Sequence, residues 1–459
     1  MRLMAFILAL ALQASMARAG ESNGATAATA SRADSDAYAV GSLAPSTGVP
    51  WNPPETMSPR RGWETTLNMP GRLITYPLTA LSALTNAGLV KLEDSGRIPT
   101  SSPIPSTFGP SLGLSFRQPG LGGRAGVGAA AEYRREVLSG PYSTVLGARY
   151  AGTLRKYNGT LISATGKPLS LRYGYDWRPE ELFYGLGHDS PEGLRTNYAV
   201  QSEYAGATAA WESRRRAIRG PRTRFSTWAQ TQTDVMSHGR GSSSVSYEDE
   251  FPAIGDATLG RRVEHLIYGA GVSLDNRSGI PHWTQGSRLL LLAERHDAPI
   301  PWLALKDGTG HGAQYTRYQI EAETGFSWRR RDPRTLRFLG RISDETQGNG
   351  GDRRLVSELS TLGGSVGLAG FEPGRFHDLD AVLGKVSYLF PLARRLEMDV
   401  HSEWGAVYRN AWTDAQFTTL SNSFGATLRL RYETGPVAAI GIDASREGVR
   451  VKYALGGLE

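Results

Sequence analysis

Ser365 holds the central position of a G-x-S-x-G pattern that runs from Gly363 to Gly367. In α/β-hydrolases this pattern places a nucleophilic serine on a sharp turn between a strand and a helix, where it can attack an ester carbonyl. Here the pattern lies in a glycine-rich stretch with no helical period after it, so the backbone freedom of glycine explains it better. We therefore predict no catalytic residue and no enzyme, with a hydrolase as the least favoured alternative.

A histidine between two carboxylates, His401 between Asp399 and Glu403, has residue types suited to a metal site or a general base. Residues two apart on one strand are about 7 Å apart, which is too far for these neighbours to share an ion easily. No second histidine has the spacing of a zinc motif. The phosphate-binding pattern GxxxxGK[ST] is also absent, so we expect no metal, no nucleotide and no other cofactor.

Arginines cluster at three places, 214–216, 329–331 and 394–395. Guanidinium groups can bind the phosphates of lipid headgroups or of lipopolysaccharide through paired hydrogen bonds. Solvated charge at a rim explains the same clusters, and both interpretations stay open. The formal net charge is +7, but we expect no nucleic-acid partner because the chain begins with an export signal.

That signal occupies residues 1–19, which we predict to be a signal peptide. Arg2 supplies the positive start, Leu3 to Leu12 the apolar stretch, and Ala17 to Ala19 a small-x-small cleavage site. No later window contains about twenty consecutive apolar residues, which argues against a membrane-spanning helix. Periplasm, outer membrane and secretion remain as destinations.

The region before the first strands contains few residues that could build a core. Residues 20–69 are rich in Ala, Ser, Thr, Gly and Pro and are predicted to form a flexible periplasmic lead. Residues 70–108 are predicted to hold one short amphipathic helix and a linker, with leucines such as Leu78 and Leu81 at near-helical spacing and a kink at Pro77. The sequence contains no cysteine, so disulfides and thiolate metal sites are excluded.

After the linker the apolar residues recur with a period of two. The segment from Leu396 to Tyr408 shows this best, since Met398 and Val400 alternate with the charged or polar Asp399 and His401. In a membrane β-barrel only alternate residues face lipid, so a low mean hydropathy is compatible with a spanning structure. The observed value is -0.34.

About fifteen such segments can be counted, and because single-chain bacterial barrels have an even number of strands we predict sixteen. We place the missing strand around Thr160 to Ala164. Tight turns such as 330–333 alternate with long polar stretches such as 237–262 and 347–378, as in barrels with short periplasmic turns and long outer loops. The predicted fold is all-β, a transmembrane antiparallel barrel over residues 109–459.

Four stretches resemble the BamA/TamA family of outer-membrane barrels and occur in the family's order. They are Phe183 to Pro191, Gly269 to Arg277, Leu362 to Asp378 and Tyr388 to Leu392. In this family a long loop folds into the lumen and carries an Arg-Gly-aromatic core. The resemblance implies the same inward-folded loop here, with the motif residues Gly370, Phe371, Gly374, Arg375 and Phe376.

This chain departs from the family at the core arginine, whose position is taken by Ala369. The acid that the family arginine reaches corresponds to Glu403. A carboxylate inside a barrel is costly unless it is paired or hydrated. We therefore expect Glu403 to be the lumen partner of the loop and Arg375 to be the cation that pairs with it.

The resemblance implies a location in the outer membrane of a Gram-negative bacterium. It also implies a role in outer-membrane biogenesis, or in the passage of protein or lipid, with outer-membrane lipids, lipopolysaccharide and a periplasmic protein as the expected partners. We recognise no POTRA domain before residue 110 and expect a barrel-only member whose first and last strands form a weak seam. A passive pore and a barrel-embedded hydrolase are the alternatives.

Overall fold

The computed structural model describes residues 114–117, 128–138, 144–153, 156–166, 168–213, 222–240, 245–252, 259–260, 262–277, 285–297, 314–328, 334–347, 355–393, 396–432 and 435–455. The chain divides into two units, Met1–Ala80 and Leu81–Glu459, and every described residue belongs to the second. The predicted signal peptide, periplasmic lead and helical segment lie outside the described residues.

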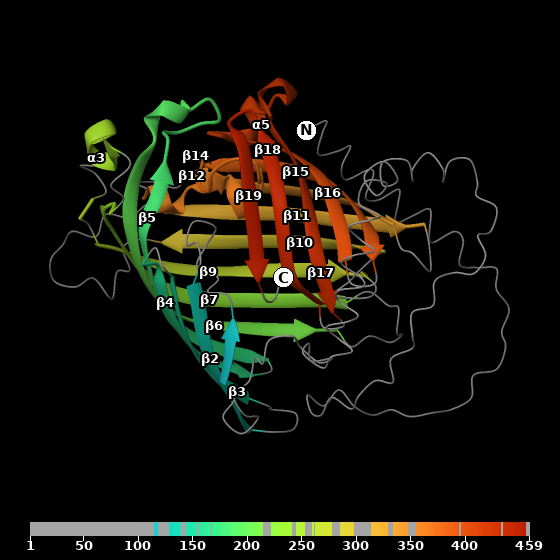
Figure 1. Cartoon of the computed structure of the whole chain (residues 1–459). Helices are drawn as coiled ribbons and strands as arrows, with labels where there is room; N and C mark the ends of the chain where they lie inside the picture. Colours follow the sequence, from blue (N-terminus) through green and yellow to red (C-terminus); the bar gives the residue numbers. More distant parts are fainter. Residues whose placement is uncertain are drawn as a thin grey trace, which may run out of the picture. The chain divides into compact units, whose positions relative to one another are not determined.

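Sixteen strands follow one another as an antiparallel meander in the described part of the chain (Figure 1). Those of the first half are β1 (Leu114–Arg117), β2 (Gly128–Leu138), β3 (Thr144–Thr153), β4 (Asn158–Gly166), β5 (Leu169–Phe183), β6 (Thr196–Glu212), β7 (Arg222–His238) and β9 (Arg262–Asp275). Those of the second half are β10 (Gly286–Asp297), β11 (Tyr315–Ser327), β12 (Thr335–Gln347), β15 (Asp380–Ala393), β16 (Leu396–Tyr408), β17 (Ser421–Tyr432), β18 (Gly435–Ser445) and β19 (Gly448–Leu455). A short strand, β8 (Val245–Ser246), adds to the same sheet by pairing in parallel with β6.

The predicted count of sixteen strands is confirmed, and β4 covers the position that we assigned to the missing strand. Period-two alternation fixes which face each side chain takes, as β16 shows. Its polar residues Asp399, His401 and Glu403 are buried on the inner face, whereas Trp404 is exposed on the outer face. Large apolar residues are exposed on the outer face of other strands as well, among them Ile440. The outer face is thus apolar and the inner face polar, as in membrane barrels.

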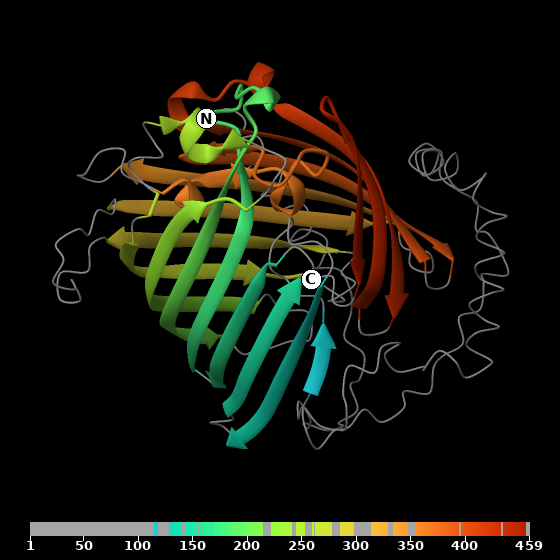
Figure 2. The same ribbon diagram turned by 60° about the vertical axis from the view of Figure 1, so that its left-hand side comes forward.

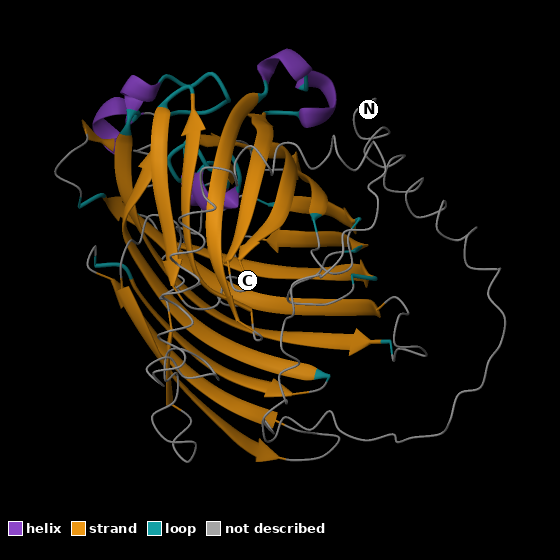
Figure 3. Ribbon diagram, turned by 45° about the vertical axis from the view of Figure 1, so that its right-hand side comes forward, coloured by secondary structure: helices purple, strands orange, loops and turns teal. Residues whose placement is uncertain are grey.

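The connections at one end of the strands are longer than those at the other. β15 joins β16 across 394–395 and β17 joins β18 across 433–434, whereas β12 joins β15 across 348–379. Most helical segments lie toward the long-loop end (Figure 3). They are η2 (Glu192–Leu194), α3 (Tyr247–Glu250), η3 (Val356–Glu358), η4 (Gly364–Val366), α5 (Ala411–Asp414) and η5 (Phe417–Thr419).

Among the residues described, no helix has both the length and the apolar character needed to cross a membrane.

The two ends of the sheet are its first and last strands. β1 pairs with β2 and β19 pairs with β18, and within the described strands no register joins β1 to β19. With 4 and 8 residues, these are also the two shortest of the sixteen strands. Figure 2 shows the red C-terminal strands and the cyan N-terminal strand at the two edges of the curved sheet. The sheet is therefore open along this seam.

Candidate functional site

The loop between β12 and β15 folds back against the inner face of the sheet. Its described part, 355–379, contains η3, β13 (Ser360–Leu362), η4 and β14 (Phe376–Asp378). β13 and β14 pair as a small antiparallel sheet, with Leu362 opposite Phe376. The loop predicted from the sequence to fold inward does so, and it has a secondary structure of its own.

The glycine-rich part of this loop follows a tight path that needs glycine at two positions. Gly363 has a φ of 123°, and a Cβ on it would lie 2.1 Å from the carbonyl oxygen of Glu372. Gly370 approaches the sheet so closely that a Cβ would lie 2.7 Å from the carbonyl oxygen of Ala444 in β18. Both positions exclude a larger side chain unless the backbone moves.

The aromatic residues of the motif build an apolar cluster inside the sheet. Phe371 and Phe376 are fully buried and meet edge to face with ring centroids 5.1 Å apart. They pack with Leu368 of the loop and with Leu383 and Val407, which project inward from β15 and β16. The cluster removes apolar surface from water and so holds the loop against the wall.

Arg375 does not pair with Glu403, so this expectation is wrong. Its Nε donates to Oε1 of Glu447 at 2.8 Å, and its terminal nitrogens donate to Oγ and the carbonyl oxygen of Ser190 at 2.9 and 2.7 Å. The guanidinium also lies between the rings of Tyr184 and Phe376, 4.7 and 4.8 Å from their centroids. Arginine can make these contacts because its five N–H groups can donate to a carboxylate and to a backbone carbonyl at the same time.

Glu403 is nevertheless a lumen partner of the loop, through a backbone group. Its Oε2 accepts a hydrogen bond from the backbone N–H of Ala369 at 2.6 Å, and its Oε1 pairs with Nζ of Lys385 at 2.7 Å. Lys385 lies directly opposite Glu403 on β15. The compensating cation therefore comes from the neighbouring strand, and the backbone N–H at the position of the family's arginine keeps the contact with the acid.

Arg375 joins the loop to another stretch that the sequence singled out, Phe183 to Pro191. Besides the contacts with Ser190, the backbone N–H of Gly187 donates to the carbonyl oxygen of His377 at 2.9 Å, and Leu186 forms a parallel bridge with His377. Two segments that resemble the same family separately in the sequence are thus one contact region in the structure.

Next to this region the carboxylate of Glu372 collects three partners. Tyr184 donates its hydroxyl to Glu372 at 2.6 Å, and the guanidinium groups of Arg195 and Arg450 lie 3.6 and 3.3 Å away. Burial would raise the pKa of Glu372, but the hydrogen bond from Tyr184 and the two positive charges outweigh it and lower the pKa. These residues line a hollow of about 520 Å³. Charged side chains such as Arg195, Glu372 and Arg450 line it, which suits a charged ligand better than an apolar one.

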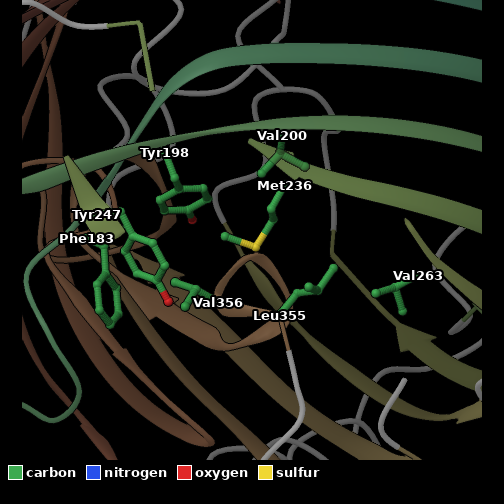
Figure 4. Packing of buried hydrophobic residues seen from close by; sticks show 8 residues of the cluster. All are labelled: Phe183, Tyr198, Val200, Met236, Tyr247, Val263, Leu355 and Val356. Carbon is green, nitrogen blue, oxygen red and sulfur yellow. The ribbon is translucent and has the colours of Figure 1, made fainter. Parts of the chain in front are cut away.

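The start of the loop packs into a second cluster. Leu355 and Val356 are buried against Met236 of β7 and Val263 of β9, and against Tyr247 of α3 (Figure 4). Sequence reasoning missed this cluster, since Leu355 and Val356 stand in a polar stretch with no period to mark them. The loop is therefore held at both of its ends.

The other sequence candidates have structural settings. Ser365 is exposed in the single turn η4, which is not a strand-to-α-helix elbow. His401 hydrogen-bonds through Nε2 to Asp443 of β18 at 2.8 Å. Asp275 and Arg277 form a two-point ion pair at the end of β9. The three arginine clusters lie outside the described residues.

Comparison with solved structures shows a likeness to BamA from Haemophilus ducreyi lacking POTRA domains 1-3, at 11% identity and a TM-score of 0.50, over 74% of this chain and 69% of that chain. CdiB from Acinetobacter baumannii is similar at 10% identity and a TM-score of 0.41, over 72% of this chain and 57% of that chain. No protein-family model and no curated protein matches the sequence. The fold is that of a BamA-like barrel.

Proposed function

We propose that this protein resides in the outer membrane of a Gram-negative bacterium and serves in the biogenesis of that membrane, through the passage or insertion of protein or lipid. The observation that carries the proposal is the combination of a seam between the two shortest strands, β1 and β19, with a lumen loop that is anchored from several strands. A wall that can part sideways suits the insertion of a hydrophobic cargo, whereas a wide, unobstructed lumen suits a pore.

The outward-facing residues support the membrane location. Ile440 and Ile442 of β18 and Val451 of β19 are each more than half exposed. Apolar surface of this extent on many neighbouring strands is unfavourable in water and favourable against lipid tails. We propose outer-membrane lipids, including lipopolysaccharide, as the immediate partners of this surface, and a periplasmic protein as the source of cargo.

The anchoring of the loop supports a closed resting lumen. Arg341 of β12 donates to the carbonyl oxygen of Val366 at 3.2 Å, and Ser445 of β18 donates to that of Gly370 at 2.9 Å. Together with the contacts of Arg375 and Glu403, these bonds join the loop to β12, β16 and β18, to the β5–β6 connection and to the β18–β19 turn. Cargo could then pass along the seam between β1 and β19 while the loop stays in the lumen.

A reversible lock across the seam tests the role. The chain has no cysteine of its own, so Phe116→Cys in β1, which is in register with Ala131 and through it with the outward Tyr150, can be combined in turn with the outward positions Val449→Cys, Val451→Cys or Tyr453→Cys in β19. We expect a cross-linked pair to fail in restoring the outer-membrane barrier of a strain that lacks this protein, and a reductant to bring the function back. Full restoration by the locked protein would contradict lateral opening.

The matched control places the disulfide between strands that are already paired. Phe424 and Ala444 are direct partners on β17 and β18, so Phe424→Cys with Ala444→Cys adds a cross-link without closing the seam, and its function should persist. Planar-bilayer conductance separates the passive pore from the proposed role. We expect small or flickering currents, and a large steady conductance of the unmodified protein would favour the pore.

A further inference from the structure

Two histidines and one glutamate converge on the inner side of the sheet, away from Arg375 and Glu403. His265 comes from β9, His296 from β10 and Glu358 from η3 of the inward loop, and one ligand atom from each lies within 4.8 Å of the other two. In the pairing of β9 with β10, His296 stands opposite Ile267, two residues from His265. The two histidines are therefore diagonal neighbours on one face of the sheet.

One ring nitrogen of each histidine is buried without a hydrogen-bond partner. His265 is fully buried; its Nε2 pairs with Oε1 of Glu358 at 2.7 Å, and its Nδ1 makes no hydrogen bond. Nδ1 of His296 is likewise buried and makes no hydrogen bond. Buried polar atoms without partners cost free energy, so each such atom calls for a ligand.

The surrounding groups orient the three side chains. Oε1 of Glu294 lies 3.1 Å from Nε2 of His296, which leaves Nδ1 of that ring for a ligand. The ring of Tyr315 stacks on His296 with centroids 4.2 Å apart and an interplanar angle of 14°. Oε2 of Glu358 accepts the backbone N–H of Leu355 at 2.9 Å, so Oε1 faces His265. A carboxylate behind a ligand histidine is the usual support of a metal site.

The charges nearby favour a cation. Asp234 on β7 is buried on the same face and acts electrostatically on His265. Glu294, Glu345 and Glu358 add three more carboxylates, and Arg317 faces this group with Nη2 2.6 Å from Glu345 and Nη1 3.3 Å from Glu294. The four carboxylates outnumber the single guanidinium, and a divalent ion would offset the negative surplus.

We propose that His265, His296 and Glu358 bind a divalent transition-metal ion of the zinc type, with His265 and His296 as nitrogen ligands and Glu358 as the oxygen ligand. Zinc bonds of about 2.0–2.2 Å place the ligand atoms of a tetrahedron about 3.4 Å apart, so small rotations of these side chains bring the three atoms to zinc and leave the fourth position to water. Because Glu358 belongs to the loop and both histidines to the wall, the ion ties the loop to β9 and β10.

This metal site stands against our sequence-based expectation of no metal. It is independent of the proposed function, since it requires neither a particular cargo nor an opening seam. The apolar cluster that contains Val263 and Val356 (Figure 4) lies two residues along the chain from His265 and from Glu358, and both histidines are buried from bulk water. A shielded site with three protein ligands is expected to bind its ion tightly and to act on the stability of the loop.

The test uses the full-length protein in detergent micelles, stripped with a chelator and then titrated with Zn²⁺ in a calorimeter. Co²⁺ absorption in the visible range serves as the second probe, since tetrahedral Co²⁺ has strong characteristic bands. We expect one ion per chain for the unmodified protein and at least a tenfold loss of affinity in His265→Gln and in His296→Gln. Zn²⁺ should raise the thermal unfolding midpoint of the unmodified protein and should not raise that of His265→Gln or His296→Gln.

His401→Gln is the matched control, because His401 is also a buried lumen histidine beside carboxylates but has no second histidine in its cluster. It should bind Zn²⁺ as the unmodified protein does. If a histidine variant does not fold, Glu358→Gln in the loop leaves the wall intact and should still lose the Co²⁺ bands. Absence of stoichiometric Zn²⁺ binding, or equal binding by His265→Gln or Glu358→Gln, would overturn the proposal.

Discussion

Arg375 shows how one residue can organise a site without touching the partner that the sequence suggested for it. Its side chain is 2% exposed and serves Ser190 of the β5–β6 connection and Glu447 of the β18–β19 turn. A buried guanidinium needs hydrogen-bond partners, and the junction of these two connections supplies a carboxylate, a hydroxyl and a carbonyl.

We expect Arg375→Ala to lower the free energy of unfolding by about 3–5 kcal/mol, because it leaves a partly buried carboxylate without its partner. Urea unfolding in detergent micelles and protease cleavage of the loop measure the change. Arg450→Ala is the control, since Arg450 is a third exposed in its pair with Glu372 and such pairs contribute about 0–1 kcal/mol. Equal effects of the two variants would rule out a special role for Arg375.

His377 predicts a pH dependence of the loop. Burial and the nearby charge of Arg375 lower its pKa to about 3, whereas a histidine in the unfolded chain titrates near 6.5. Between these values the unfolded chain binds a proton that the folded chain does not. The stability that His377 contributes is therefore full above about pH 6.5 and declines as the pH falls toward 3.

Thermal unfolding at pH 7, 5.5 and 4.5 checks this expectation. His377→Gln should flatten the decline by at most about 1.4 kcal/mol per pH unit. The same decline in His377→Gln as in the unmodified protein would assign the pH dependence to other groups.

At the scale of elements, the inward loop behaves as a folded unit attached to the wall. The β13–β14 pair, the turn η4 and the buried rings of Phe371 and Phe376 give it an internal framework. Its glycines serve this framework, because Gly363, Gly364 and Gly367 all have positive φ. This is the reason that the serine-hydrolase pattern arises here without the geometry of a nucleophile.

Gly363→Ala should therefore weaken the loop, since its φ of 123° and the 2.1 Å approach to Glu372 leave no room for a Cβ. We expect a loss of about 1–3 kcal/mol and faster proteolysis of the loop. Gly384→Ala in β15 is the control, because a Cβ there would meet its nearest neighbour only at 3.9 Å. Unchanged proteolysis of Gly363→Ala would show that the loop tolerates another path.

At the scale of the whole described unit, one alternating pattern produces a polar inner face and an apolar outer face. The outer face should respond to charge according to depth in the bilayer. Ile440 lies in the middle of β18, and Leu169 lies at the start of β5, where the short connections are. Both are exposed on the outside.

Ile440→Arg should lower stability in lipid vesicles by about 2–4 kcal/mol, and Leu169→Arg by about 0–1 kcal/mol, because the cost of a charge falls toward the interface. Reversible urea unfolding in vesicles measures both values. A pair of small and equal effects would indicate that this face does not meet lipid, and would count against the proposed location.

Sequence alone determined the strands, because alternation and turn residues are local properties. Fifteen of the strands follow from a period of two read along the chain, and the sixteenth, β4, was placed because single-chain bacterial barrels have an even number of strands. It also marked the residues of the loop core, since glycines at tight turns and aromatic residues between them stand out in composition. The functions of the motif residues Gly370, Phe371, Gly374, Arg375 and Phe376 stay a prediction.

Only the tertiary structure showed which side chains of the loop and of the wall contact each other. Arg375 lies in the loop before β15, and Glu403 lies in the next strand, β16. Even so, Arg375 hydrogen-bonds to Ser190, whereas Glu403 pairs with Lys385 and accepts the backbone N–H of Ala369. The convergence of His265 with Glu358 was equally invisible. The physical reason is that a long loop on the inner side of a curved sheet can contact residues of many strands. Burial, charge and donor geometry select its partners only after the sheet has brought distant strands together.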